Sequence, residues 1–528
     1  MTAFTGVAPL LRFVLRRDRV FLPVWILSIV VLTYASAAAV RRTYDTQVEI
    51  DSYAANIGSS PASIAMAGPP VALREIGGIL IYETSLTALV GVALMAIFSV
   101  VRHTRREEEA GRVELLGSTV VSPHAVITAA VVVAGLASVV VGFGVALAFQ
   151  AEQQPALEST LYGASIAAMG IVFAGVAACA AQLMTHARGA VGLSLAVLGL
   201  AFALRAVGDV GNSLWSWLSP MGWSQQVRLY DDNRPWPLAL SLTLTVLLLV
   251  ATVVLESRRD LGAGIVPARP GVAEASPSLS GVLGLSWRLQ RGAVLGWAIG
   301  VWAMGLTFGS FSESIENMVE DNPTLAQYFE SIGAESIVDA FFATAMVLLG
   351  ILAAGYAVSS ALRTRAEESA DRLEPVLATG VSRPRWLLGS LLVTLVGTTV
   401  VVAAGGFGVG LSYAGTTKEV SEIWRMTAYS LAYLPAVLVL VAVAVLLVGW
   451  VPRVAGAAWA ALAVCFVISY LGGLLELPQS LLDVSPFTHV PGVPAEELTA
   501  APLVVLLLLA GAGVAVGLVG FRRRDIAS

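Results

Sequence analysis

The charged side chains whose spacing suggests chemistry are concentrated in one polar segment, residues 102–124, which reads RHTRREEEAGRVELLGSTVVSPH. On a helix, Val113, Leu116 and Val120 fall on one narrow apolar stripe, while the acids and Arg112 largely occupy the other faces. If this segment follows a membrane span, its arginines help to fix the orientation of the chain across the membrane. Acids contribute little to that orientation, so their presence needs another explanation. The pattern predicts a short amphipathic helix that either rests on a membrane surface or exposes its polar face to a partner.

A second segment, residues 363–385, repeats these charges in the same order. We therefore expect docking helices over 107–118 and 367–378, with Ser122-Pro123 and Ser382 with Pro384 as cap-like entries to the helices that follow. Two symmetric docking segments suit a cytosolic partner that is itself a dimer. The residues predicted to couple to that partner are Glu107, Glu108, Arg112, Glu114, Glu367, Glu368, Arg372 and Glu374.

Long apolar runs must position both segments. Of the 528 residues, 57% are apolar and 13% are charged, whereas a soluble domain carries roughly 25% charged residues. Runs of about 20 apolar residues can cross the hydrocarbon core as helices. The predicted fold is an all-α polytopic membrane protein with about a dozen spans. These lie near 20–40, 79–101, 125–149, 161–184, 189–209, 237–255, 292–313, 338–362, 386–412, 427–450, 454–474 and 501–521.

Arginine positions predict the orientation. Most of the 31 lysine and arginine residues fall on one side of these spans if the N-terminus is inside, so the positive-inside rule places both termini in the cytoplasm. Residues 1–37 resemble a signal peptide, with Ala35-Ser36-Ala37 as a cleavage-like site. The apolar run is too long for that, and it has a counterpart in the second half, so we expect it to be retained as a span.

Matches in the same order along the two halves indicate an internal repeat. Besides the charged segments, Gly142-Phe143-Gly144-Val145 matches Gly406-Phe407-Gly408-Val409, and Ser219-Pro220 matches Ser485-Pro486. Because both halves start and end inside, the two six-helix repeats are predicted to be parallel. The expected organisation is a first half over 1–255 with an amphipathic helix at 5–19, a linker over 256–285 rich in proline and small residues, and a second half over 286–528.

Several residues within or near the spans are candidates for a substrate pathway. Glu83 and Asp339 are pseudo-equivalent acids near the outer ends of their spans, where a carboxylate is either structural or part of an outer gate. Arg205 and Asp209, which are not among these candidates, are four residues apart, which favours an ion pair between them. The remaining candidates for the pathway are Phe202, Phe466 and Tyr470.

Other chemistry has no visible basis in the sequence. Cys179 and Cys465 lie in separate apolar runs, and with only four scattered histidines neither a disulfide framework nor a metal site is indicated. A net charge of −5 does not indicate nucleic acid as a partner. A P-loop needs a lysine that reaches the phosphates, but the single lysine, Lys418, falls in a predicted outer loop. No catalytic residue and no bound cofactor are therefore expected.

The pattern E-E-x-A-G-R-x-E-L-L-x-S-x-x-x-S-P in the first segment resembles the coupling-helix loop of ABC-2-type exporter permeases. The stretches 219–228 and 259–264 are similar to those of the actinobacterial polyketide-antibiotic (tetronasin-type) exporters, which fuse two six-helix units. The resemblance covers essentially the whole chain. It implies a multi-pass permease in a bacterial plasma membrane that extrudes hydrophobic or amphipathic compounds. Two copies of a separate cytosolic ABC ATPase would bind ATP and Mg²⁺.

The second half departs from this pattern, because Pro486-Phe487-Thr488-His489 replaces Pro-Met-Gly-Trp and Pro375 stands opposite Leu115. Unequal roles for the halves are therefore expected. Two alternative functions remain open from the residues. One is a proton-coupled twelve-helix transporter, although its G-x-x-x-D-R-x-G-R-like signature is not evident. The other is a non-transporting scaffold that recruits a cytosolic protein through the same loops.

Overall fold

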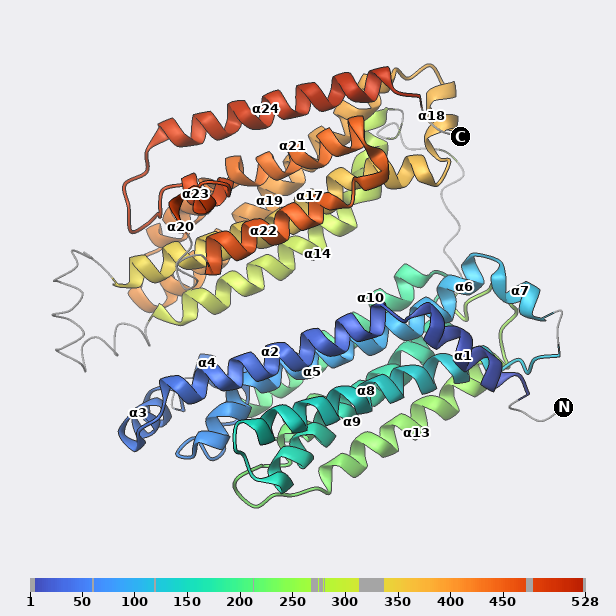
Figure 1. Ribbon diagram of the computed structural model, residues 1–528, viewed down its shortest axis with the longest axis vertical. Helices are drawn as coiled ribbons and strands as arrows, with labels where there is room; N and C mark the ends of the chain where they lie inside the picture. The colour runs from blue at the N-terminus through green and yellow to red at the C-terminus, as the bar shows by residue number, and fades with distance from the viewer. Residues whose placement is uncertain are drawn as a thin grey trace. The chain divides into compact units, whose positions relative to one another are not determined.

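The computed structural model describes residues 5–58, 61–117, 120–211, 213–266, 274, 279, 281–312, 337–471 and 478–525. Contacts within the chain divide it into two compact units, Met1–Gly271 and Val272–Ser528. Figure 1 shows the first unit in blue to green and the second in yellow-green to red. The boundary between the units falls inside residues 256–285, the segment predicted as a linker.

The first unit consists of helices, of which the long ones run roughly alongside one another (Figure 1). Its α1 packs against α8 and lies at the end of the unit where α6 and α7 are found. The helices are α1 (Val7–Arg17), α2 (Phe21–Thr43), α3 (Gln47–Ile57), α4 (Pro61–Ala67), α5 (Ile76–His103), α6 (Arg105–Glu109), α7 (Arg112–Gly117), α8 (Ala125–Ala151), α9 (Ala156–Leu183), α10 (Ala187–Val210), α11 (Leu214–Trp217), α12 (Pro220–Gln225) and α13 (Pro237–Glu256).

The second unit is built in a similar way, with long helices and short connecting ones. The α14 helix packs most extensively against α19, and α21 packs against α24. Its elements are α14 (Val282–Ser310), α17 (Ile337–Ser369), α18 (Leu373–Ala378), α19 (Arg383–Thr417), α20 (Ser421–Leu431), α21 (Leu434–Trp450), the 3₁₀ turn η2 (Pro452–Val454), α22 (Ala457–Leu471), α23 (Gln479–Leu482), the 3₁₀ turn η3 (Pro486–His489) and α24 (Ala500–Arg523).

Eleven helical stretches within the described residues are long and apolar enough to cross a membrane, with α5 and α6 counted together and α20 and α21 counted together. The Ala457–Ser469 part of α22 is a shorter apolar helix. Each predicted apolar run coincides with one of these twelve. The prediction of an all-α polytopic membrane protein with about a dozen spans is confirmed. The N-terminal amphipathic helix predicted at 5–19 corresponds to α1, which buries Val14 and exposes Arg12 and Arg16.

Burial separates central spans from peripheral ones. In the most apolar stretch of α9, 78% of the residues are buried, compared with 17% for α13 and 22% for α24. The α13 helix leaves Leu242, Leu247 and Val250 more than half exposed. Apolar side chains on an outward face would be unfavourable in water, but they match a hydrocarbon solvent. The peripheral helices are therefore held within their units by few buried side chains.

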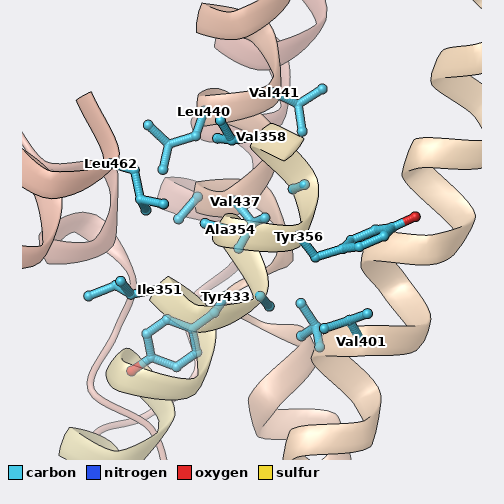
Figure 2. Close-up of a cluster of buried hydrophobic side chains, with 14 of the residues drawn as sticks. Ile351, Ala354, Tyr356, Val358, Val401, Tyr433, Val437, Leu440, Val441 and Leu462 are labelled. Atoms are coloured by element: carbon cyan, nitrogen blue, oxygen red, sulfur yellow. The ribbon is translucent and has the colours of Figure 1, made fainter. Parts of the chain in front are cut away.

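The core of the second unit is formed where α17, α19, α21 and α22 meet (Figure 2). Val358 on α17 lies among Leu440 and Val441 of α21, and Leu462 of α22 approaches from another side. Val358 is completely buried. Dispersion contacts between such closely packed side chains support a fixed arrangement of these helices.

Candidate functional site

The first charged segment forms two short helices rather than one. The chain leaves α5 at His103, forms α6 over Arg105–Glu109, and turns before α7 begins at Arg112. Gly111 at this turn has φ +70°, a left-handed conformation that glycine adopts without steric cost. The prediction of a single amphipathic helix over 107–118 was wrong, because this turn separates the acids of α6 from the acid of α7.

The second charged segment turns at the matching position. There α17 continues past the membrane-crossing region to Ser369, and α18 begins at Leu373. Asp371, which occupies the place of Gly111, has φ +54°. The docking helix predicted over 367–378 is therefore also interrupted, and only α18 forms a separate short helix.

The predicted apolar stripe and cap-like entries also need correction. Val113 is half-buried, whereas Val120 is 73% exposed, and the Leu116 side chain lies outside the described residues. The following helix, α8, begins at Ala125 with His124 as its N-cap and no side-chain cap, so Ser122 does not cap it. Ser382 does occupy the N-cap position of α19, with Pro384 in the first turn, but its hydroxyl makes no capping hydrogen bond.

Glu107 connects three short elements of the first unit. Its carboxylate accepts hydrogen bonds from Arg112 Nε at 2.6 Å and Arg112 Nη2 at 2.9 Å. Arg17 Nη1, at the end of α1, lies 2.7 Å from Glu107 Oε1. Charge-assisted and bidentate pairs of this kind fix geometry more firmly than neutral hydrogen bonds do. Glu107 therefore ties α6 to α7 and to α1, and its side chain is only 11% exposed.

Glu108 points to a different set of partners, away from α7. Arg259, which follows α13, donates from Nη1 to Glu108 Oε1 at 2.5 Å and from Nη2 to Oε2 at 3.0 Å. Arg105 Nη1 donates to Oε2 at 2.8 Å, and the backbone N–H of Gly262 donates to Oε1 at 2.7 Å. Side-chain exposure is 6% for Glu108 and 9% for Arg259, so this ion pair is internal.

Arg105 is the centre of the same network and is 1% exposed. Its guanidinium donates to the backbone carbonyls of Thr185, Gly262 and Ala263 as well as to Glu108. A buried charge is tolerated only when it is paired and hydrogen-bonded, and Arg105 meets this condition. The result is that α6, the turn between α9 and α10, and the segment after α13 are held together.

In the second unit, Glu368 has the corresponding role. Arg524, which follows α24, donates from Nη1 to Glu368 Oε1 at 2.5 Å and from Nη2 to Oε2 at 2.6 Å. Arg365 lies 3.3 Å from the same carboxylate, whose side chain is completely buried. Glu367 is held less closely, at 3.4 Å from Arg363 and 3.5 Å from Arg372. The second unit therefore repeats the Glu108–Arg259 pair but has only a loose version of the Glu107 cluster.

Glu114 on α7 and Glu374 on α18 differ from the other predicted acids because both are exposed. Leu115 beside Glu114 is 72% exposed. Arg112 and Arg372 are also exposed, although each reaches back to the acid of its own loop. Of the predicted coupling acids, Glu114 and Glu374 therefore present the surface that a second protein can reach. Glu108 and Glu368 do not, because their carboxylates bind arginines inside the unit.

The two predicted outer acids each have a partner within their own unit. Tyr53 of α3 donates its hydroxyl to Glu83, whose side chain is exposed. Burial, and then the nearby Glu83 carboxylate, raise the pKa of Tyr53, so its hydroxyl stays protonated and able to donate. Asp339 lies 3.8 Å from Arg425. These contacts attach Glu83 to α3 and Asp339 to α20, and a gating role stays a prediction.

Phe202, the pathway candidate on α10, lies beside the predicted ion pair of that helix. Arg205 is completely buried, lies 3.6 Å from Asp209, and stacks over the Phe202 ring at 4.8 Å from its centroid. The predicted ion pair on α10 is thus confirmed. Phe466 is half-buried and packs against the core of the second unit, while the Tyr470 side chain lies outside the described residues.

Sequence reasoning missed several residues of this site. Arg17 and Arg524 were read only as orientation signals, and Glu109, which accepts from the Ala187 N–H at the start of α10, was given no role. A usable signal was present, because Arg-Arg-Asp follows the last span of each half at 258–260 and 523–525. Two histidines also pair with acids 2.6 Å away, His103 with Asp18 and His124 with Glu256.

Within the described ranges, no group of three or more His, Cys, Asp and Glu side chains could hold a metal ion. Cys179 and Cys465 are separate buried thiols. What the arrangement offers is a pair of exposed short helices, α7 and α18, each of which follows a segment that holds a buried ion pair, Glu108–Arg259 before α7 and Glu368–Arg524 before α18.

Comparison with known proteins gives this site a family context. The profile of "Multidrug efflux system permease Rv1217c, C-terminal domain" matches residues 279–522. The multidrug efflux system permease protein Rv1217c of Mycobacterium tuberculosis (strain ATCC 25618 / H37Rv) is 40% identical over 528 residues, covering 99% of this chain and 96% of the relative. Similarity of this extent includes both units and both charged loops. The chain therefore belongs to the Rv1217c family of multidrug efflux system permeases.

Proposed function

We propose that this chain is the membrane-spanning permease of an ATP-driven exporter, and that separate cytosolic ABC ATPase subunits bind to α7 and α18. The observation that carries the proposal is the full-length relationship to a protein named as a multidrug efflux permease. The sequence supports separate hydrolysis, since its single lysine, Lys418, forms the left-handed C-cap of α19 rather than part of a phosphate-binding loop.

The proposed substrates are hydrophobic or amphipathic compounds, and the proposed direction is outward. The name of the relative supports efflux, and the apolar spans suit compounds that partition into lipid. We propose further that this chain belongs to the antibiotic-exporting branch and has two parallel six-helix halves. Both termini are proposed to be cytoplasmic, which puts α7 and α18 on the side where ATP is available.

Two proposed docking helices, one in each unit, suit two copies of an ATPase subunit. Glu114 and Glu374 are exposed acids on these helices, so each provides a negative charge to a basic or polar groove. The buried pairs Glu108–Arg259 and Glu368–Arg524 hold the segments that precede these helices against their units. A rigid exposed helix on an anchored base is suited to receive the movement of a bound subunit.

Reconstitution tests this proposal. The purified chain in lipid vesicles should show no ATP hydrolysis by itself, and adding the ATPase subunit encoded with it should produce hydrolysis and outward movement of a lipophilic dye. Dye movement driven by a proton gradient without any ATPase subunit would instead establish a secondary transporter. Binding of a cytosolic protein without transport of any probe would establish a scaffold.

Labelling of introduced cysteines tests the proposed orientation. Ala110 and Ala370 are exposed near the charged loops, and Ala55 and Lys418 are exposed at the other ends of the spans. Cysteine at 110 or 370 should react with an impermeant maleimide only in inverted vesicles, and cysteine at 55 or 418 only in intact cells. The native thiols are buried and should give little background. Reaction at 110 in intact cells would reverse the orientation.

A further inference from the structure

Each charged loop is joined to the end of the last span of its own unit by a bidentate ion pair. In the first unit the pair is Glu108–Arg259 and in the second it is Glu368–Arg524. The partners are 151 and 156 residues apart in the chain. We call these the loop-to-span pairs. The similarity of the two loops does not by itself require an arginine at the end of α13 or α24. That the same pair occurs in both units therefore indicates a shared role.

The loop-to-span pairs are well suited to transmit movement. Three of the four charged side chains are no more than 9% exposed, and Arg524 is 15% exposed. Removing one partner of such a pair leaves a buried charge without compensation, which is strongly unfavourable. Two parallel hydrogen bonds between guanidinium and carboxylate also fix the relative orientation of the two groups. A displacement of the loop therefore carries the arginine with it.

In the first unit the connection is reinforced along the segment that follows Arg259. Arg105 binds the Gly262 and Ala263 carbonyls, and the N–H groups of Ile265 and Val266 donate to the carbonyls of Gln182 and Leu183 at 3.2 and 2.9 Å. The backbone at Gly264 lies so close to α9 that an added Cβ would be 2.6 Å from the Thr185 nitrogen. The end of α13 is thus attached to α6 and to α9.

The helices attached in this way are among the least buried spans of their units. The α5 and α8 helices are continuous in sequence with the first loop, so they move with it directly. The α13 and α24 helices are not, and only 17% and 22% of the residues in their most apolar stretches are buried. Because lipid gives little resistance to a peripheral helix, an internal connection is needed to make it follow a docking event.

We propose that the loop-to-span pairs couple the docking loops to α13 and α24, so that Glu108, Arg259, Glu368 and Arg524 are positioning residues for transport. This inference rests on the proposed docking of ATPase subunits at α7 and α18. It predicts that breaking a pair leaves ATPase binding and hydrolysis in place but reduces transport per ATP hydrolysed. A purely structural role would instead reduce folding, binding and hydrolysis together.

Adjacent arginines supply matched controls. Arg259→Gln and Arg524→Gln remove the guanidinium of each pair, whereas Arg258→Gln and Arg523→Gln remove the same charge from exposed neighbours. We expect the first two variants to bind wild-type amounts of ATPase subunit and to lower dye transport per ATP about tenfold, within the usual range of coupling free energies. Arg259→Lys should fall between, because lysine keeps the charge but not the fork geometry. The controls should stay near wild type.

Wild-type transport per ATP in both folded Arg259→Gln and Arg524→Gln variants would overturn the inference, as would equal losses of binding and transport. If these variants do not fold, the separation between two spin labels can be measured instead in the complex with both pairs intact. Spin labels at the exposed positions 110 and 258 should keep their separation between the nucleotide-free and ATP-bound states. A change larger than one helical turn, about 5 Å, would show that the pair opens. If wild-type chain does not bind the ATPase subunit, the proposed function fails instead.

Discussion

The two charged loops have related sequences, but they hold their first acid differently. In the first loop Glu107 binds Arg112 and Arg17 at 2.6 to 2.9 Å. In the second loop Glu367 lies 3.4 to 3.5 Å from Arg363 and Arg372. The second acid is paired closely in both loops. The difference indicates that the connection to the last span is the shared requirement, while the attachment to the N-terminal helix is particular to the first unit.

The difference has a structural origin at the start of each unit. In the first unit α1 is a separate helix that ends at Arg17 and places its guanidinium beside Glu107. In the second unit α14 is one continuous helix over Val282–Ser310, with the exposed Arg288 in the corresponding region. A small cavity of about 50 Å³ there is lined by residues including Glu367, Arg372 and Trp386. The first loop is therefore more firmly supported.

The largest expected effect comes from Arg105, which is buried in the first loop, in comparison with its counterpart Arg365 in the second. Arg105→Ala should lower the free energy of unfolding by about 3 kcal/mol, because it breaks a fully buried ion pair and leaves backbone carbonyls without a donor. Arg365→Ala should cost about 1 kcal/mol, since Arg365 is 30% exposed and lies 3.3 Å from Glu368. Denaturation in detergent micelles measures both. Equal losses would contradict the proposed asymmetry.

A smaller effect is expected at the first acid of each loop. Glu107→Gln should cost about 1 to 2 kcal/mol, because hydrogen bonds to charged groups are stronger than neutral ones and Glu107 accepts from two arginines. Glu367→Gln should cost less than about 0.5 kcal/mol at its longer distances. Raising the salt concentration should narrow the gap between the variants. A larger loss at Glu367 than at Glu107 would reverse the comparison.

The smallest effect concerns the left-handed turns. Gly111→Val should cost about 1 to 2 kcal/mol, because a β-branched residue fits φ +70° poorly. Gly111→Asp should cost less than half of that, because Asp371 already occupies the equivalent conformation in the second loop. Asp371→Gly should be nearly neutral. If Gly111→Asp is as damaging as Gly111→Val, the two turns are not equivalent.

The spans could be predicted from sequence because the hydrocarbon core imposes length and apolarity on each helix separately. The twelve apolar runs were found, and the ion pair of Arg205 with Asp209 followed from helical spacing. The interior of the charged loops could not be predicted in the same way. The sequence pattern predicts the first loop as one continuous helix, although the chain turns at Gly111. The pattern therefore assigns Glu107, Glu108 and Glu114 to the polar surface of a single helix.

Ion pairs between segments far apart in the chain were the second feature that could not be predicted from the sequence. Arg259 and Arg524 lie more than 150 residues from Glu108 and Glu368, and their charge is equally well explained by the positive-inside rule. Only their repetition after both last spans distinguishes them. Glu114 and Glu374 are exposed because they sit on short helices beyond the turns, and their role in docking stays a prediction.

The most direct test of the account is to measure ATPase-subunit binding to chains altered at the two exposed acids. Glu114→Lys should weaken binding clearly and Glu374→Lys less, because the first loop is better supported. Glu419→Lys, an exposed reversal beside Lys418 at the other end of α19, is the matched control and should bind normally. All three should fold normally, since exposed substitutions usually cost within about 0.5 kcal/mol. Wild-type binding and hydrolysis with the Glu114→Lys, Glu374→Lys double variant would contradict docking at α7 and α18.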